Sequence, residues 1–246
     1  MVAVHQNSVD CSNISMTQKY HIDCLVDQLL SPTRRYTRFG LGPIQEGQGL
    51  TIANNLRRAL LDGVPGWGIT SASLQGAKHE FMVLEGVRES VLEILLNLRE
   101  VVLTNEFEVE TKTLLGFLNK QGPCLVYAKD LVLPKGLTVV DPNQVIASIS
   151  SDGQLAGEFR IEYGTKFNPK SFSSKTTPFL AIGGSFFPIK RVNYTIQKEL
   201  NPITGEDNEY IFLELLTDNS IHPRRAILSA VDYLFDLFNP LKGYLV

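Results

Sequence analysis

The fold of this chain is decided by the stretch Gly47-Gln-Gly-Leu-Thr-Ile-Ala-Asn-Asn-Leu-Arg-Arg-Ala-Leu-Leu61. Two glycines form a turn, and after them apolar residues recur at the three- and four-residue spacing of an amphipathic helix. These residues are Ala53, Leu56, Ala59 and Leu60. Thr51 is expected to cap the first turn, because its hydroxyl can accept a hydrogen bond from an unpaired backbone N–H. Glycine and proline at positions 63–66 end the helix, since neither residue continues it well.

The other side of this helix is mixed in character. Asn54, Arg58 and Leu61 share it, and Arg57 lies beside them. One interpretation is that the two adjacent arginines simply belong to a solvated helix face. Their place beside Asn55 and Leu61 favours contact, because arginine bonds carboxylates in a planar fork and is enriched at interface hot spots. The apolar face is therefore expected inside a dimer, and the second face against a much larger partner.

The bulk properties exclude several classes of protein. The chain has 246 residues, 43% of them hydrophobic, a net charge of −3 and a pI of about 5.8. This is a poor charge balance for a chain that binds nucleic acid strongly by itself. Three cysteines, odd in number and far apart in the sequence, predict neither a disulfide framework nor a zinc site. No apolar run approaches the roughly 20 residues that cross a membrane.

The remaining pattern predicts an α+β protein. Strands are expected over residues 20–26, 35–41 and 68–74, and a helix over 87–99. Short alternating runs separated by Gly, Pro, Asn and Asp then predict an antiparallel, β-rich module. Its strands are expected at 107–111, 124–128, 137–140, 145–149 and 158–162, and residues 166–178 read as an exposed loop.

After Gly183 and Gly184 the chain returns to longer elements. Strands over 188–198 and 209–217 read as a hairpin around a turn at 201–205. Pro223 suits the first position of a helix that is expected to run to about residue 239, before Pro240. Its apolar stripe is broader than the single face that a surface helix usually buries, so burial against both a sheet and a second chain is expected. The alternative is burial of the whole stripe within one large monomer. The stripe consists of Ile227, Ala230, Val231, Leu234, Phe235 and Phe238.

This succession of elements predicts an interrupted domain. Residues 19–66 and 186–246 belong together as a dimerisation domain, in which helices cover an antiparallel sheet. Residues 67–185 form an inserted β-rich domain, and residues 1–18 form a flexible tail without the apolar segment of a secretory signal.

No motif for catalysis, cofactor binding or metal binding emerges. The Gly47–Gly49 turn lacks the further residues of a dinucleotide site or a P-loop, and Val83 stands where a zinc-binding helix that began at His79-Glu80 would need a second histidine. Two alternatives stay open: an enzyme with a dispersed active site in the insert, and a stand-alone nucleic-acid-binding protein that uses Arg57, Arg58 and the loop over 166–175. Neither a cofactor nor a metal ion is predicted.

Two blocks of the sequence resemble a known family. The run from Arg38 to Leu61 is similar to the signature of the alpha subunit of bacterial-type DNA-directed RNA polymerase. His79-Glu80-Phe81, followed by the run from Gly86 to Leu98, resembles the next block of that family, in order and at the right separation. A chance match to both is very improbable.

The resemblance implies a non-catalytic subunit of a nucleotidyltransferase complex that acts in transcription. Such subunits form homodimers, on which the large beta and beta-prime subunits assemble. The positions that match the large-subunit interface are Asn55, Arg57, Arg58, Leu61, His79, Glu80, Gly86 and Val87. The positions that match the dimer interface are Leu56, Leu60, Ile227, Val231, Leu234 and Phe238.

Departures from the family pattern refine these expectations. The sequence Tyr163-Gly-Thr-Lys-Phe167 stands where the family has Arg-Gly-x-Gly-Tyr, so contacts made by that loop are in doubt. The chain stops at Val246, before the family's DNA- and activator-binding domain, so direct DNA binding is not expected, nor is a membrane association. Strand residues 192–196 and 211–215 resemble the plastid and cyanobacterial branch. A plastid-encoded chain of the chloroplast stroma is expected, with the cytoplasm of a cyanobacterium as the alternative.

Overall fold

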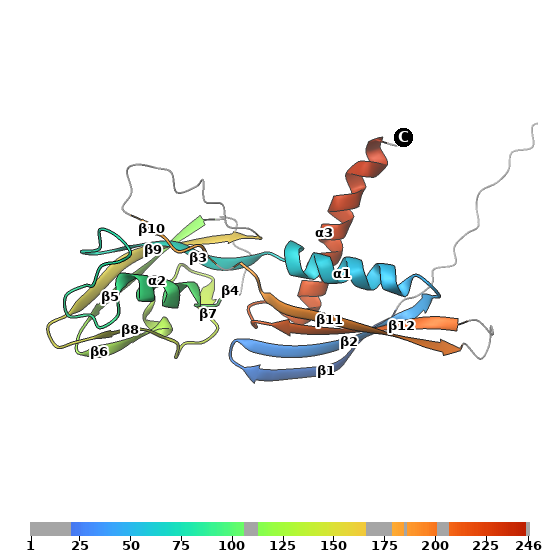
Figure 1. Ribbon diagram of the computed structural model, residues 1–246, viewed down its shortest axis with the longest axis horizontal. Helices are drawn as coiled ribbons and strands as arrows, with labels where there is room; N and C mark the ends of the chain where they lie inside the picture. Colours follow the sequence, from blue (N-terminus) through green and yellow to red (C-terminus); the bar gives the residue numbers. More distant parts are fainter. Residues whose placement is uncertain (1–20, 106–112, 166–178, 185, 201–206, 245–246) are drawn as a thin grey trace, which may run out of the picture.

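The structure, a computed structural model, describes residues 21–105, 113–165, 179–184, 186–200 and 207–244. Side chains are described up to residue 240. Figure 1 shows two lobes side by side, one built on a four-stranded sheet and the other on a larger curved sheet. The fold is α+β with antiparallel strand pairing, as predicted.

The first lobe pairs strands from the two ends of the described chain. Its sheet has the order β1-β2-β12-β11, and each neighbouring pair is antiparallel. The strands are β1 His21–Ser31, β2 Arg34–Gln45, β11 Ile189–Leu200 and β12 Asp207–Thr217. Helices α1 (Gly49–Gly63) and α3 (Pro223–Tyr244) pack against this sheet. The central pair, β2 with β12, therefore joins segments more than 160 residues apart in sequence.

The core of this lobe lies between α1 and the sheet. The predicted apolar face of α1 is buried here, with Leu60 1% exposed. Phe39 and Ile44 of β2 and Ile211 of β12 meet it from the sheet, each at most 2% exposed. The alternation of buried and half-buried residues along β12 leaves its second face, with Phe212 and Glu214, on the outer side.

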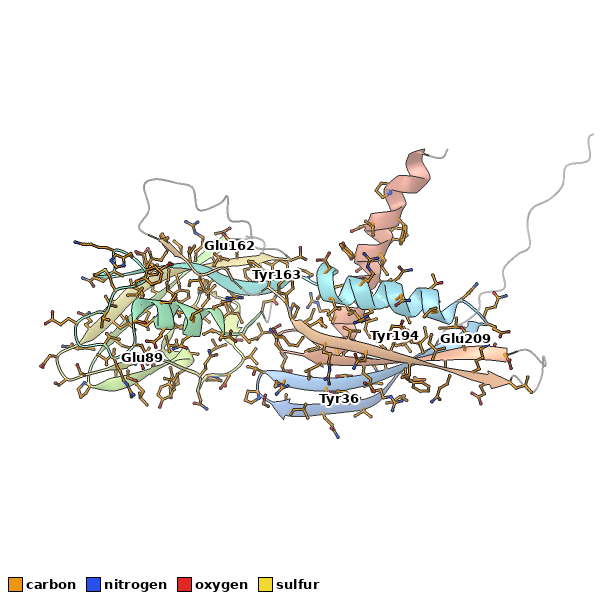
Figure 2. All side chains as sticks on the ribbon, viewed as in Figure 1. Tyr36, Glu89, Glu162, Tyr163, Tyr194 and Glu209 are labelled. Atoms are coloured by element: carbon orange, nitrogen blue, oxygen red, sulfur yellow. The ribbon has the colours of Figure 1, made fainter. Side chains whose placement is uncertain are left out.

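The start of α1 is held by a carboxylate from a distant strand. The helix begins at Gly49, its cap residue Gln48 makes no side-chain capping bond, and Thr51 lies inside the helix, so the predicted Thr51 cap is wrong. Instead, the Gly49 backbone N–H donates to Oε2 of Glu209 at 2.8 Å. Glu209 is 7% exposed and lies on β12 at this end of the helix (Figure 2). A charged acceptor also suits the positive end of the helix dipole.

We expect Glu209→Ala to destabilise the lobe by about 1–3 kcal/mol, because it leaves the Gly49 N–H without an acceptor. Glu209→Gln keeps an acceptor oxygen and should cost less. Urea denaturation followed by circular dichroism, at one fixed protein concentration, measures the difference. Equal losses for the two variants would show that the cap contributes nothing and that only packing matters at this position.

The second lobe encloses its own core. Its main sheet has the order β5-β9-β3-β4-β7, with β10 paired to β3, while β6 and β8 form a separate pair. The strands are β3 Gly66–Leu74, β4 Leu103–Asn105, β5 Thr113–Gln121, β6 Cys124–Tyr127, β7 Leu137–Val139, β8 Val145–Ile149, β9 Gln154–Gly164 and β10 Leu180–Ala181. A 3-10 turn spans Ala128–Asp130, and helix α2 (Val91–Arg99) buries Val91, Ile94, Leu95 and Leu98.

Two helix ends differ from the prediction. Helix α2 begins at residue 91, not 87, because Ser90 and Glu93 form a capping box: Ser90 Oγ accepts from the Glu93 N–H, and the Ser90 N–H donates to Glu93. Helix α3 continues through Pro240 to Tyr244.

Three predicted segments lie outside the described residues. They are the strand over 107–111, the loop over 166–178 and the turn at 201–205. No helix in the described ranges is both long and apolar enough to span a membrane.

Candidate functional site

Helix α3 carries apolar side chains that the described part of the chain leaves exposed. Its first turns are packed, with Ala226 and Ala230 fully buried. The helix then extends away from the lobe (Figure 1), and Phe235 is 67% and Phe238 52% exposed. Leu228, Val231 and Leu237 are also exposed. An exposed apolar surface of this size is typical of an interaction site.

Two grooves flank this helix where it meets α1. The first, which we term the sheet groove, has a volume of about 330 Å³ and apolar walls apart from Asn55. It is lined by Ile22, Leu41, Ile44, Ile52, Asn55, Leu56, Ile227, Val231 and Leu234. The second, the helix groove, has a volume of about 460 Å³ and lies between α1 and the outer part of α3. It is lined by Asn55, Arg58, Ala59, Leu61, Asp62, Tyr233, Leu234, Leu237 and Phe238.

The helix groove brings together residues that the sequence assigned to different interfaces, since Arg58 and Leu61 share it with Leu234 and Phe238. The sheet groove is lined by four residues that were expected in the dimer interface: Leu56, Ile227, Val231 and Leu234. Leu56 and Ile227 are each 5% exposed. Leu60 lines neither groove. Because α1 lies against the sheet, the Leu60 side chain is packed into the lobe's own core.

The arginine pair of α1 is divided between two roles. Arg57 Nε donates to the Val192 carbonyl oxygen at 3.3 Å, and Tyr194 donates from its hydroxyl to Asn54 Oδ1 at 2.7 Å. These contacts fix α1 to β11. Arg58 is exposed in the helix groove beside Leu61, which is 37% exposed. Within the described part of the chain, Arg58 makes no hydrogen bond or ion pair, so it is available to a partner.

A second exposed apolar patch lies on the turn before α2. His79 is exposed and Glu80 is half-buried. Beside them Phe81 is 73% and Val83 67% exposed. Sequence reasoning did not select these two residues, because a short irregular turn has no periodicity that separates an exposed apolar side chain from a buried one.

Gly86 and Val87 make contacts inside the second lobe. Val87 is 5% exposed and bridges to Ile149 in the core of the second lobe. Gly86 has a φ of +74° and accepts hydrogen bonds from the backbone N–H and the hydroxyl of Ser150. A Cβ at Gly86 would lie 2.4 Å from the Gly153 Cα, so the two backbones touch.

Gly86→Ala is expected to destabilise the second lobe by about 3 kcal/mol or more. Alanine is strained at the positive φ of this position, and its Cβ would clash with the backbone of Gly153. Gly47→Ala is the matched control, since Gly47 has a φ of +84° with nothing within 4 Å of its added Cβ. It should cost only about 1 kcal/mol, the penalty for a left-handed alanine. Thermal unfolding of both variants measures the difference, and equal shifts would show that the contact between Gly86 and Gly153 is irrelevant.

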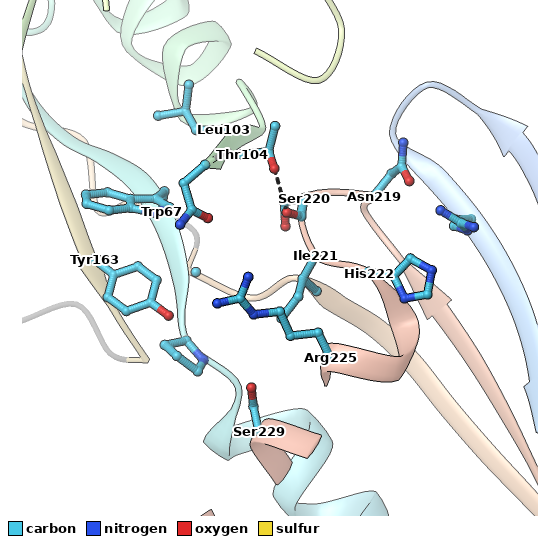
Figure 3. A pocket seen from close by; sticks show the side chains of 14 residues that line it. Trp67, Leu103, Thr104, Tyr163, Asn219, Ser220, Ile221, His222, Arg225 and Ser229 are labelled. Atoms are coloured by element: carbon cyan, nitrogen blue, oxygen red, sulfur yellow. Dashed lines mark hydrogen bonds between the residues drawn. The ribbon is translucent and has the colours of Figure 1, made fainter. Parts of the chain in front are cut away.

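A polar cleft of about 400 Å³ separates the two lobes (Figure 3). Thr104 of β4 donates to the Ser220 carbonyl oxygen across it at 2.8 Å. Trp67 and Tyr163 pack on its wall with ring centroids 4.9 Å apart. Burial raises the pKa of the Tyr163 hydroxyl, and the positive charge of Arg225 partly opposes that rise. No cluster of His, Cys, Asp and Glu suited to a metal ion occurs among the described residues.

Comparison with known proteins gives consistent matches. Residues 69–186 match the model of the "RNA polymerase Rpb3/RpoA insert domain". The chain is 39% identical over 232 residues to the DNA-directed RNA polymerase subunit alpha of Guillardia theta, an alignment that covers 92% of this chain and 70% of the relative. Subunits of the same name in Cyanidium caldarium (39%; 90% and 70% covered) and Trichormus variabilis (35%; 91% and 71%) are also similar. These relatives come from algae and cyanobacteria.

Proposed function

The chain belongs to the family of DNA-directed RNA polymerase alpha subunits, and on that premise we propose that it forms a homodimer that assembles the beta and beta-prime subunits. It has a non-catalytic role in transcription. The observation that carries the dimer is the uncovered apolar side of α3 beside an apolar groove. A two-fold dimer would use both features at once, because each helix could fill the groove of the other copy.

In this proposal, the large subunits bind to exposed residues that lie outside the dimer contact. Arg58 and Leu61 on α1 form one contact, and His79, Glu80, Phe81 and Val83 form another on the second lobe. An exposed arginine beside an apolar groove suits a partner segment with an acidic residue next to apolar ones. Asn55 borders both grooves, so we place it at the junction of the two interfaces.

The two lobes are proposed to be the two domains expected from the sequence: residues 19–66 with 186–246, and residues 67–185. Two separate sets of buried residues support this division, one in each lobe. We also propose a location in the plastid, or in the cytoplasm of a cyanobacterium, on the basis of the organisms of the relatives.

Affinity purification of the tagged full chain from its native organism tests the assembly role. We expect two very large subunits to copurify, with this chain at twofold stoichiometry by quantitative mass spectrometry and with RNA synthesis activity in the eluate. Recovery of the chain as a dimer without large subunits would contradict the assembly role while leaving the dimer intact.

A further inference from the structure

The two lobes are joined by two adjacent chain crossings. The chain passes into the second lobe at residues 64–66 and returns to the first lobe at residues 186–188. A Cβ added to Gly66 would lie 2.8 Å from the Phe186 carbonyl oxygen, so the two crossings run in contact. Two crossings at one place can act as a hinge, because a few backbone rotations there turn one lobe against the other.

A hydrogen bond provides a third attachment between the lobes. Thr104 Oγ1 on β4 donates to the Ser220 carbonyl oxygen at 2.8 Å, as the dashed line in Figure 3 shows. Two cavities, of about 400 and 270 Å³, lie between residues of the first lobe and residues of the second. Domains with so open a contact are expected to move against each other unless specific bonds restrain them, and this hydrogen bond is such a restraint.

The turn that carries the acceptor is itself held by several hydrogen bonds. Asp218 Oδ1 accepts the Ser220 backbone N–H at 3.0 Å and also the Ser220 hydroxyl. The Asp218 N–H donates to the Pro188 carbonyl oxygen at 2.9 Å, which connects the turn to the second crossing. Asn219, with a φ of +65°, donates from its side-chain amide to the Pro32 carbonyl oxygen at 3.2 Å. The acceptor is therefore fixed to the first lobe, directly before α3 begins.

The donor is fixed to the second lobe in a similar way. Thr104 is the central residue of β4, where it pairs with Thr138 of β7. Its neighbour Leu103 is 1% exposed in the core and pairs with Trp67 of β3. Because donor and acceptor are each held by their own lobe, this hydrogen bond determines how one lobe is placed relative to the other.

We propose that Thr104 and the turn over residues 218–220 form a lock that sets the angle between the lobes. The proposed large-subunit contacts lie on both lobes, with Arg58 on α1 of the first and Phe81 on the second. This inference rests on the proposed function, since a large subunit that binds both contacts at once gains affinity only when their separation matches its own sites. Thr104 is then a positioning residue, which acts through the angle that it fixes.

Distances between spin labels measure this angle. Cys24 is exposed on β1 of the first lobe and Asp152 is exposed in the second, so labels on Cys24 and Asp152→Cys lie on opposite sides of the lock. Cys11 and Cys124 are replaced by alanine, and labelled chains are diluted into unlabelled ones so that each dimer carries one labelled copy. We expect one narrow distance distribution, and a broader one for Thr104→Val, which removes the donor and keeps the shape of the side chain.

The lock offers a matched control and a second test. Thr104→Ser keeps the donor hydroxyl, so it should keep the narrow distribution. Asn219→Gly keeps the left-handed backbone but loses the bond to Pro32, and it should broaden the distribution from the acceptor side. Titration with a purified large subunit should show a loss of about three- to tenfold in affinity for Thr104→Val, the factor that corresponds to one hydrogen bond, and none for Thr104→Ser.

Thermal unfolding verifies that each variant is folded. An unchanged distribution in folded Thr104→Val overturns the lock, and equal broadening by Thr104→Ser would assign the effect to packing in place of the hydrogen bond. A broader distribution with unchanged affinity overturns the role of the lock in assembly. If the unmodified protein binds no large subunit, the proposed assembly role fails by itself, whereas the distances still decide whether the lock exists.

Discussion

Replacing Leu234 with glutamate is expected to convert the proposed dimer into monomers. Leu234 lines both grooves and is half-buried in a single chain, so the substitution places a carboxylate at the centre of the apolar contact. Two-fold symmetry buries two such groups in each dimer. Because each uncompensated buried charge costs several kcal/mol, we expect the dissociation constant to rise by about a thousandfold or more.

Light scattering during size-exclusion chromatography measures the result directly. The unmodified protein should have twice the 27.4 kDa mass of one chain, and Leu234→Glu should have that mass once. Arg224→Glu places the same side chain on the same helix outside both grooves, and it should remain a dimer. Circular dichroism verifies that each variant is folded. A folded Leu234→Glu protein that keeps the dimer mass would remove α3 from the interface.

Arg58→Ala is expected to leave the dimer intact and to weaken binding of a large subunit by about 10- to 100-fold. This is the usual effect of truncating an arginine at the centre of an interface. The reason is its position: the side chain is exposed in the helix groove and forms no ion pair within the described residues. Titration of the dimer with purified beta or beta-prime subunit measures the loss.

The location of Arg58 also allows a role in the dimer contact. Arg58 shares the helix groove with Leu234 and Phe238, which the sequence assigned to the dimer. A monomeric Arg58→Ala protein would mean that the dimer contact extends over both grooves. Arg58→Lys is a useful companion, because it keeps the charge without the planar fork and should recover only part of the affinity.

Periodic patterns predicted the fold well. The apolar spacing of α1, the alternation in β12 and the broad stripe of α3 each follow from the period of the element, so they could be predicted before any tertiary contact was known. The α+β class and the antiparallel sheets follow from the same patterns. The same periodicity indicated the apolar faces expected in a dimer, and the family resemblance supplied the residues expected to contact the large subunits.

Features that depend on distant contacts could not be predicted. Glu209 replaces Thr51 as the cap of α1 only because β12 lies beside the helix start, 160 residues later in the chain. Leu60 and Val87 are apolar and lie close to surface residues in sequence, and only the packing shows that both are buried. The inter-lobe cleft had no sequence signal, since its walls come from five separate segments.

The pairing of β2 with β12 sets an order of events during synthesis. A ribosome releases β2 and α1 long before β12 exists, so the first lobe waits with an incomplete sheet while the intervening lobe can already fold. Such non-local pairing is slow, because a long loop must close first. Helix α3 follows β12, and its exposed leucines and phenylalanines emerge only when the sheet that supports them is complete. The apolar side of α3 that the proposed dimer uses is therefore the last part of this lobe to be synthesised.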